Sequence, residues 1–361
     1  MSTPKYLWIK KEIKSSILDG TYPKESKIPS ESTFRKQYNV SRHTVRQAIS
    51  KLVNEGYLIK RQGSGTYVSE GYLQNENRST KKIGVITTYL SDYIFPSIIR
   101  GIEEELSQKQ YSLILSSTHN NVEKEKVSLE NMLHQNVDGI IVEPTKSSLL
   151  NPNLNYYLKI IQNKIPMLML NAKYEELDVP VITMNDLKAG KIATDYLISL
   201  GHTKIANITK SDDYQGKNRL KGYINALNDK ELSFESNHLV SYDTETIEEI
   251  PKQIKSVISG TSAPTAFVCY NDQIAILLIQ ELLSMGKDVP EDFSVVSIDN
   301  SYLSTTMPSI RLTSVNHPKE KMGKVAAEWM IKAIESKTFK NNPIIFEPSL
   351  IIGDSAKQLE K

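Results

Sequence analysis

The sequence has few cysteines, with only Cys269 in 361 residues. An intrachain disulfide is therefore impossible, and a metal site built from clustered cysteines is excluded. We expect Cys269 to be a buried small hydrophobic residue. Long apolar runs are also absent, so the chain has no candidate membrane-spanning helix. Its first residues alternate lysines with isolated apolar residues, unlike an export signal. These absences predict a cytoplasmic protein without a membrane partner.

Catalytic sequence motifs are missing as well. The glycines of GSGTYV lack the third glycine of a dinucleotide-binding fingerprint, and no GxSxG, HExxH or P-loop sequence occurs. A Ser/His/Asp assembly formed by folding stays open, since most chains contain these residue types. We predict no catalytic residue, no metal and no cofactor.

The charge is unevenly distributed along a chain whose composition is globular and whose length suggests two or three domains. Residues 1–70 carry 13 Lys and Arg against 6 Asp and Glu, whereas residues 71–361 carry 31 against 36. The net charges of +7 and −5 add to the overall +2. A short basic segment joined to a larger acidic one is typical of a nucleic-acid-binding domain attached to another domain.

The basic segment has the pattern of three helices and a hairpin. Apolar residues at helical spacing predict a helix over residues 5–18, Ser30 caps a second helix, and Ser41 caps a third that ends at Gly56. The third helix has one apolar stripe, and its opposite face carries long polar side chains that suit a DNA major groove. These are Arg42, His43, Arg46, Gln47 and Ser50. Residues 57–61 and 66–68 predict strands around a glycine-rich tip.

The rest of the chain alternates strands and helices. Residues 70–81 are polar and nearly free of apolar periodicity, so we predict a linker there, between a domain at 1–69 and a domain at 82–361. From Ile83 onward the βαβ pattern predicts an α/β fold with parallel sheets. The pattern restarts near residue 204, which indicates two lobes. We place the first lobe at about 82–182 and 318–344 and the second at about 183–317 and 345–361.

Three linked motifs, KIPSESTF, NVSRHTVRQAISKLVNEGYL and RQGSGTYV, make residues 5–68 resemble the GntR-type winged helix-turn-helix. The resemblance implies that the third helix reads the major groove of double-stranded operator DNA and that the hairpin is a wing. The implied contacts are Arg42, His43 and Arg46 to bases, Ser32, Thr44 and Lys5 to phosphates, and Gln62 and Gly63 from the wing. The alternative is a solvated helix face beside an ordinary hairpin.

Residues 82–361 resemble the effector domain of LacI/GalR-type repressors and the related periplasmic sugar-binding proteins. The resemblance rests on IGVIT, RGIEEEL, DGIIVEP, LGHTKIANI, RLKGY, CYNDQIA and VPEDFSVVSID, among others. It implies a two-lobed, periplasmic-binding-protein-like domain. One feature departs from the pattern: EGYLQNENRSTK lacks the leucine-bearing hinge helix of LacI-type proteins, so minor-groove wedging should not be carried over.

Ligands of two-lobed sugar binders lie at the carboxyl ends of the strands, so the residues after each apolar strand are candidates. Combined with the resemblance, this predicts effector contacts by Asp92, Tyr93, Phe95, Lys146, Arg219, Asn271, Asp299 and His317. Strand-end capping is the alternative for each. Asp272 more often supports a loop or helix start, and for Asn185 and Asp186 an N-cap role is at least as favoured as a ligand contact.

The fusion of these two domains, with TTYLSDYIFPSIIRGIE and IIVEPTKSS, resembles repressors that respond to arabinose. L-Arabinose is therefore the expected effector. Another sugar or a sugar phosphate stays open, since Lys146 and Arg219 also suit a phosphate. We expect a homodimer on a pseudo-palindromic operator, with RGIEEELSQKQ as a candidate interface helix, released by sugar. Two further hypotheses are an activator of the same architecture and a periplasmic-type sugar-binding protein.

Overall fold

The computed structural model describes residues 4–69, 79–91, 93–260, 262–308, 310–336 and 342–359. The chain forms two compact units, Met1–Thr80 and Lys81–Lys361. Residues 70–78 of the predicted linker lie outside the described residues, as does the effector candidate Asp92. No helix in the described ranges is long and apolar enough to cross a membrane.

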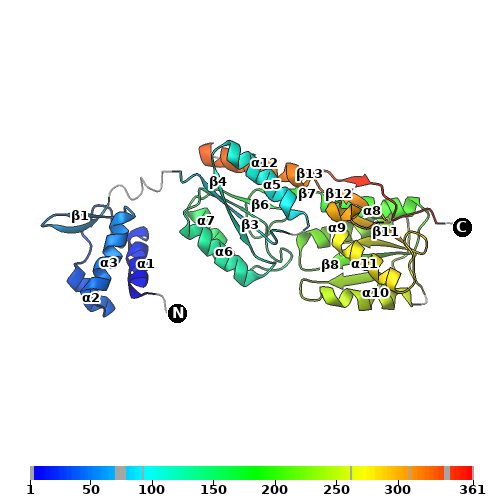
Figure 1. Cartoon of the computed structure of the whole chain (residues 1–361), viewed down its shortest axis with the longest axis horizontal. Helices are drawn as coiled ribbons and strands as arrows, with labels where there is room; N and C mark the ends of the chain where they lie inside the picture. Colours follow the sequence, from blue (N-terminus) through cyan, green and yellow to red (C-terminus); the bar gives the residue numbers. More distant parts are fainter. Residues whose placement is uncertain are drawn as a thin grey trace. The chain divides into compact units, whose positions relative to one another are not determined.

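The first unit is a three-helix bundle followed by a hairpin (Figure 1). Its elements are α1 (Lys5–Leu18), α2 (Glu31–Tyr38), α3 (Arg42–Asn54), β1 (Leu58–Arg61) and β2 (Gly65–Val68). Ser30 and Ser41 cap α2 and α3 by accepting the amide N–H three residues on, each at 3.2 Å. The apolar stripes of the three helices meet in one core. The helices and hairpin that the sequence pattern predicts are confirmed.

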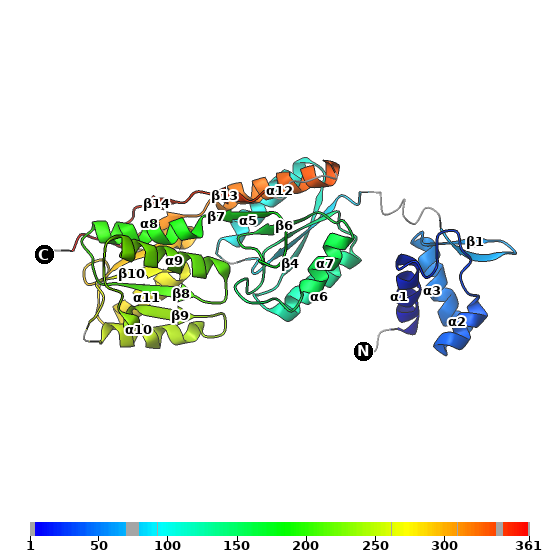
Figure 2. The same ribbon diagram turned by 180° about the vertical axis from the view of Figure 1, so that it is seen from behind.

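The first lobe of the second unit has a six-stranded parallel sheet in the order β13-β7-β6-β5-β3-β4. Its strands are β3 (Lys82–Thr87), β4 (Ser112–Ser117), β5 (Gly139–Val142), β6 (Met167–Leu170), β7 (Val181–Met184) and β13 (Ile344–Phe346). Its helices are α5 (Phe95–Gln108), α6 (Val122–His134), α7 (Leu154–Gln162) and α12 (Lys319–Ser336). Helices α5 and α12 pack on each other over one face, and α6 and α7 cover the other (Figures 1 and 2).

The second lobe repeats this plan with the sheet order β14-β12-β11-β10-β8-β9, in which only β14 runs antiparallel to its neighbour. Its strands are β8 (Ile205–Lys210), β9 (Leu239–Tyr242), β10 (Ala266–Cys269), β11 (Ser294–Asp299), β12 (Thr313–Asn316) and β14 (Ser349–Ile351). Its helices are α8 (Asp186–Ser199), α9 (Tyr214–Asp229), α10 (Ile250–Ile258) and α11 (Asp272–Ser284), with 3₁₀ turns at Ser236–His238, Ile247–Glu249 and Tyr302–Thr305. Cys269 is fully buried in β10, as expected.

The chain passes between the lobes three times, after β7, after β12 and after β13. The first-lobe sheet extends to Met184 and Phe346, two residues beyond the predicted lobe boundaries at 182 and 344, because β7 and β13 pair with each other as far as those two residues. One apolar core runs through both lobes beneath α5, α12, α8 and α9. The predicted α/β fold with parallel sheets is confirmed.

Candidate functional sites

A cavity of about 290 Å³ lies between the two lobes, at the carboxyl ends of their strands. Loops of both lobes line it, and the lining combines aromatic rings with a large share of polar and charged side chains. Parallel sheets place the carboxyl ends of their strands at one edge, which is where ligands of open α/β sheets bind. The fold therefore provides a small-molecule cleft in the second unit.

Arg219 of α9 is the centre of the polar network in this cleft, and only 6% of its side chain is exposed. Its guanidinium donates from Nε to Asp186 at 2.8 Å and from Nη2 to Asp299 at 3.0 Å. It also donates from Nη1 to the carbonyl oxygen of Tyr270 at 2.7 Å. Two buried carboxylates on one guanidinium form a charge-assisted network that fixes all three side chains.

The packing of α8 on α9 brings Asp186 within reach of Arg219. A Cβ on Gly190 would lie 2.0 Å from the Arg219 carbonyl oxygen, and one on Gly222 would lie 2.1 Å from the Leu187 carbonyl oxygen. Both distances are far below van der Waals contact, so these two glycines permit the close approach of the helices. The cleft geometry therefore depends on glycines outside the cleft.

Asp186 and its neighbour Asn185 divide the two roles that the sequence left open. The Asn185 side chain accepts the Lys188 amide N–H at 3.1 Å and caps α8, whereas Asp186 points to Arg219. Burial raises the pKa of Asp186 to about 6, although Arg219 opposes the shift. Burial therefore favours the neutral form of the Asp186 carboxyl more than water does, while Arg219 favours its charged form.

Asp299, at the end of β11, is the second carboxylate on Arg219. Its other oxygen accepts the Tyr93 hydroxyl at 2.6 Å, which joins the loop after β3 in the first lobe to the second lobe. Burial acts to raise the pKa of Asp299, but Arg219, His317 and the Tyr93 hydrogen bond together hold it below its ordinary value. Asp299 is thus an ionised acceptor in the cleft wall.

Three buried side-chain atoms of the cleft have no hydrogen-bond partner among the described residues. They are Asn171 Oδ1, Gln215 Oε1 and His317 Nδ1, and all three residues line the cavity. Burial lowers the pKa of His317 to about 4, so its ring is neutral and offers one donor and one acceptor. Buried polar groups in native proteins are nearly always paired with protein, water or a ligand, so these atoms mark positions where water or a polar ligand bonds to the cleft wall.

The first-lobe wall of the cleft is built around Glu143, which follows β5. Its carboxylate accepts the Thr88 hydroxyl at 2.6 Å, the Thr88 amide N–H at 2.9 Å and the Asn171 side-chain amide at 2.8 Å. Burial raises the pKa of Glu143 despite these bonds. Glu143 thereby orients Asn171 toward the cavity.

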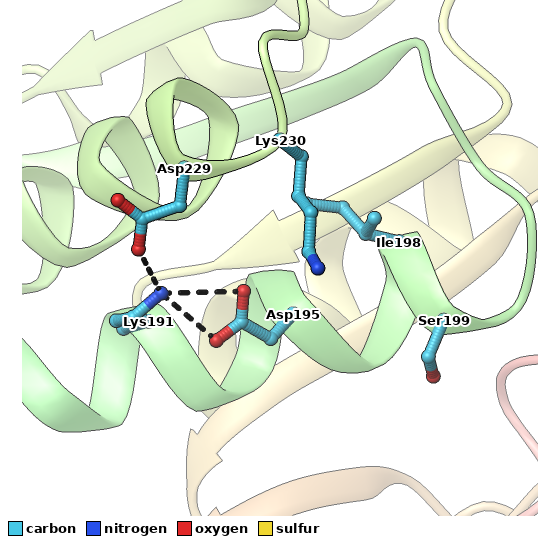
Figure 3. A pocket seen from close by; sticks show the side chains of 6 residues that line it. All are labelled: Lys191, Asp195, Ile198, Ser199, Asp229 and Lys230. Carbon is cyan, nitrogen blue, oxygen red and sulfur yellow. Dashed lines mark hydrogen bonds and ion pairs between the residues drawn. The ribbon is translucent and has the colours of Figure 1, made fainter.

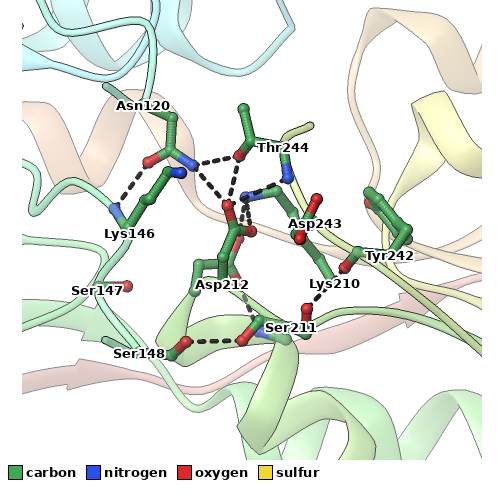
Figure 4. Close-up of polar contacts among 12 residues, drawn as sticks. Asn120, Lys146, Ser147, Ser148, Lys210, Ser211, Asp212, Tyr242, Asp243 and Thr244 are labelled. Carbon is green, nitrogen blue, oxygen red and sulfur yellow. Dashed lines mark hydrogen bonds and ion pairs between the residues drawn. The ribbon is translucent and has the colours of Figure 1, made fainter. Parts of the chain in front are cut away.

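Direct contacts between the lobes close the rim of the cleft (Figure 4). Asn120 of the first lobe donates to the Thr244 hydroxyl at 2.6 Å and to Asp212 at 3.3 Å in the second lobe. Lys146 forms an ion pair with Glu245. We call Asn120, Lys146, Asp212, Thr244 and Glu245 the rim contacts.

A second hollow lies on the outer surface between α8 and α9 (Figure 3). Lys191 bridges Asp229 at 2.7 Å and Asp195 at 3.1 Å there, and these two carboxylate side chains are 58% and 39% exposed. The hydrogen bond to Asp229 is the main cause that raises the pKa of Lys191. Exposed ion pairs of this kind contribute little stability. The six described residues that line this hollow include no buried polar group without a hydrogen-bond partner.

The polar face of α3 in the first unit is exposed and held in place by an acidic residue. Arg42 and Arg46 donate to Glu31 of α2 at 3.1 Å and 3.3 Å. Burial acts to raise the pKa of Glu31, but the two arginines lower it below its ordinary value. One carboxylate of α2 therefore holds two guanidinium groups of α3, the helix that carries the long polar donors.

The remaining DNA-contact candidates lie on the same unit. Lys5 begins α1 and is exposed, as are His43 on α3 and Gln62 and Gly63 at the hairpin tip. Gly63 has φ +74°, a left-handed conformation that glycine adopts without strain. The hydroxyls of Ser32 and Thr44 bond to the cap residues Ser30 and Ser41 at 2.7 Å and 2.8 Å.

Comparisons with known proteins match both parts of the chain. The bacterial regulatory proteins of the gntR family match residues 5–68, and a periplasmic binding protein-like domain matches residues 194–356. The arabinose metabolism transcriptional repressor of Geobacillus stearothermophilus is 44% identical over 360 residues, which cover 99% of this chain and 98% of that protein. This chain belongs to the arabinose metabolism transcriptional repressors.

Other members and related folds support the same assignment. The arabinose metabolism transcriptional repressor of Halalkalibacterium halodurans is 43% identical over 364 residues, covering 98% of this chain and 97% of that protein. The crystal structure of the transcription regulator CcpA of Lactococcus lactis has a TM-score of 0.68 at 27% identity and covers 78% of this chain and 100% of that chain. As a member of this repressor family, the chain is a DNA-binding transcriptional repressor.

In this repressor, the fold brings most of the predicted effector residues to the cleft. Tyr93, Phe95, Arg219, Asn271, Asp299 and His317 line the cavity. Lys146 does not line it, because its backbone, at φ +45°, turns the side chain to Glu245 at the rim. Asn271 also caps α11 by accepting the Ile274 amide N–H at 3.0 Å. The carboxylate of Asp272 is buried and accepts the hydroxyls of Ser297 and Ser314 at 2.5 Å and 2.7 Å.

Sequence reasoning missed several residues that line the repressor's cleft. They include Tyr89, Glu143, Asn171, Lys210, Gln215 and Tyr270. Glu143 and Asn171 follow apolar strands, as the predicted residues do, so the rule that selects strand ends also applies to them. Gln215 lies in the first turn of α9, and only the packing of that helix places it in the cleft.

Proposed function

We propose that this repressor binds L-arabinose in the cleft between its lobes and releases its operator when the sugar is bound. The observation that carries this proposal is the set of unpaired buried atoms on Asn171, Gln215 and His317, all lining one cavity. Two of these atoms are amide oxygens that accept a hydrogen bond, and the His317 ring nitrogen donates or accepts according to its tautomer; each sugar hydroxyl both donates and accepts, so a sugar can satisfy all three. The remaining wall includes Tyr89 and Phe95, whose ring centroids lie 5.8 Å apart and which offer the apolar surface that the carbon face of a sugar needs.

The size of the cavity favours a monosaccharide. Pockets for small molecules span about 300–1,000 Å³. The volume of about 290 Å³ in this cleft lies just below that range. A single sugar ring is therefore the class of ligand that fits, which agrees with the arabinose in the names of the full-length relatives.

The charges of the lining favour a neutral sugar over a sugar phosphate. Among the described residues that line the cavity, five carry carboxyl groups and two are cations, Lys210 and Arg219; the five are Glu143, Asp186, Asp213, Asp243 and Asp299. Lys210 is already paired with Asp212 at 2.7 Å and with Asp213 at 3.2 Å, and Arg219 is paired with two carboxylates. A phosphate would bring at least one further negative charge to this acidic surface, at a Coulombic cost.

A thermal-shift screen of the full chain tests the ligand. The sugars are L-arabinose, D-xylose, D-ribose, D-galactose and D-glucose, with arabinose 5-phosphate as the charged comparison. A ligand that binds only the folded state raises the midpoint temperature of unfolding by mass action. At a concentration one hundred times its Kd, it adds about 2.7 kcal/mol to the free energy of unfolding. We expect the largest rise with L-arabinose and none with the phosphate. A larger rise with the phosphate than with every neutral sugar would refute the charge argument.

On DNA, the exposed face of α3 and the hairpin tip fit an operator-reading surface. Arg42, His43 and Arg46 are the proposed base contacts, Ser32, Thr44 and Lys5 the phosphate contacts, and Gln62 and Gly63 the wing contacts. A homodimer that acts in the cytoplasm would read the two halves of a pseudo-palindrome, with half-sites about 34 Å or a multiple apart. The test is the stoichiometry on a defined operator fragment, where two chains per fragment are expected and one chain would contradict the proposal.

The names of the full-length relatives favour repression over activation and over catalysis, since both are transcriptional repressors. We propose that the chain has no enzymatic activity and no cofactor. The polar groups of the cleft support this, because the carboxylate of Asp299 is bonded to Arg219 and Tyr93, and no side-chain hydrogen bond among the described residues joins it to the His317 ring as an acid–base pair would require.

A further inference from the structure

Lys319 is the first residue of α12 and directs its ammonium group inward. Its Nζ donates to the backbone carbonyl oxygens of Asp299 at 2.7 Å, Asn300 at 2.9 Å and His317 at 3.0 Å. A lysine ammonium has three donors, so these carbonyls account for all of them. Lysine side chains usually extend to solvent. This lysine instead directs its whole donor capacity to the backbone around the cleft.

Two of these carbonyls belong to residues with an unusual backbone. Asp299 has φ +99° and Asn300 has φ +42°, two consecutive non-glycine residues with positive φ. Each such residue costs on the order of 1–3 kcal/mol and persists only where its surroundings hold it. Their other backbone supports are neutral, such as the His317 amide N–H, which reaches the Asp299 carbonyl at 3.3 Å. The Asn300 amide N–H also donates to the Ser314 hydroxyl at 2.9 Å, so Lys319 is the charged donor among otherwise neutral supports.

The strained segment sets the direction of the Asp299 carboxylate, which meets Arg219 at 3.0 Å and Tyr93 at 2.6 Å. The hydrogen bonds of Lys319 also connect the two lobes, because α12 packs on the first lobe and Asp299 ends a strand of the second. A shift of α12 relative to β11 would therefore move the carboxylate that faces the cavity. Lys319 does not line the cavity itself.

We propose that Lys319 is a positioning residue for the effector, which holds the Asp299–Asn300 backbone in the conformation that presents Asp299 to the cleft. The inference rests on the proposed sugar-binding function. It adds a residue that acts on the ligand only through Asp299.

Lys319→Met in the full chain tests the inference, because methionine keeps most of the side-chain length and removes the donors. Loss of hydrogen bonds from a charged donor is expected to weaken L-arabinose binding about ten- to hundredfold in a calorimetric titration. Operator affinity without sugar should stay at the wild-type value, since the first unit is unchanged. Lys319→Arg, which keeps the charge and the donors, should recover most of the affinity. Lys332→Met, at an exposed lysine of the same helix, is the matched control and should bind as wild type.

The outcomes separate the inference from the proposed function. If the wild-type chain binds none of the sugars in the screen, the proposed function fails, and with it the basis of this inference. If the wild type binds L-arabinose and Lys319→Met binds it equally well, the positioning role is wrong. A variant that loses sugar affinity and operator affinity together, without recovery in Lys319→Arg, would show a purely structural role and overturn the inference. If Lys319→Met does not fold, Lys319→Gln, which keeps two neutral donors, replaces it in the test. Wild-type L-arabinose affinity in Lys319→Gln would also overturn the positioning role.

Discussion

Arg219→Met should destabilise the second unit strongly, because it leaves two buried carboxylates without their cation. The guanidinium lies 2.8 Å from Asp186 and 3.0 Å from Asp299, and all three side chains are at most 6% exposed. Removing one partner of a buried ion pair typically costs about 3–5 kcal/mol. We expect a loss of this size in the free energy of unfolding of the full chain at pH 7.5, measured by urea titration with circular dichroism as the signal.

The pH dependence of this loss identifies its cause. Without Arg219, the pKa values of Asp186 and Asp299 rise in the folded state, so the variant is favoured at low pH and loses stability as the pH rises through those values. The loss should therefore be smaller at pH 5 than at pH 7.5. Arg311→Met is the control, since Arg311 is 56% exposed and 4.0 Å from Asp354, and should cost less than about 1 kcal/mol. A loss for Arg219→Met that matches the control, or that does not change with pH, would refute the reasoning.

Three further predictions concern other parts of the chain. Burial raises the pKa of the Asp186 carboxyl to about 6, and Asp186→Asn removes this titrating group. The stability of the wild type relative to this variant should therefore fall by roughly 2 kcal/mol from pH 4 to pH 7. A difference in unfolding free energy that does not change with pH would contradict the raised pKa. Arg46→Ala should lose about 1–3 kcal/mol of discrimination between operator and mismatched DNA while non-specific binding persists, and unchanged selectivity in gel-shift titrations would count against a base contact. Asn120 lines the cavity and also bonds to Asp212 and Thr244 of the other lobe, so Asn120→Ala should weaken L-arabinose binding severalfold; unchanged affinity would show that this rim contact plays no part in binding.

The first unit was predictable from sequence because its signals are local. The caps Ser30 and Ser41, the apolar stripe through Val45 and Leu52, and the glycines of the hairpin act within a few residues of each other. Helix period and cap chemistry therefore identified the elements and their exposed face. The pairing of Arg42 and Arg46 with Glu31 spans two helices and could not be inferred from spacing alone.

The cleft was predictable only in part, because strand ends are local signals and helix packing is not. Asp299 is the last residue of β11 and Asn271 lies two residues after β10, so the rule for parallel sheets selects them. Lys146 also follows a strand, but a left-handed backbone turns it to the rim. Lys319 begins a helix and acts on a backbone segment about twenty residues earlier in the chain, which no sequence pattern reveals.

The measurement that tests the account most directly is the coupling between sugar and operator. Operator affinity is measured with and without saturating L-arabinose, and L-arabinose affinity with and without saturating operator. Because linkage is reciprocal, both affinities should fall by the same factor, about 5- to 150-fold for a coupling of typical size. Equal L-arabinose affinity with and without operator would contradict the claim that the sugar in the cleft releases the repressor from DNA.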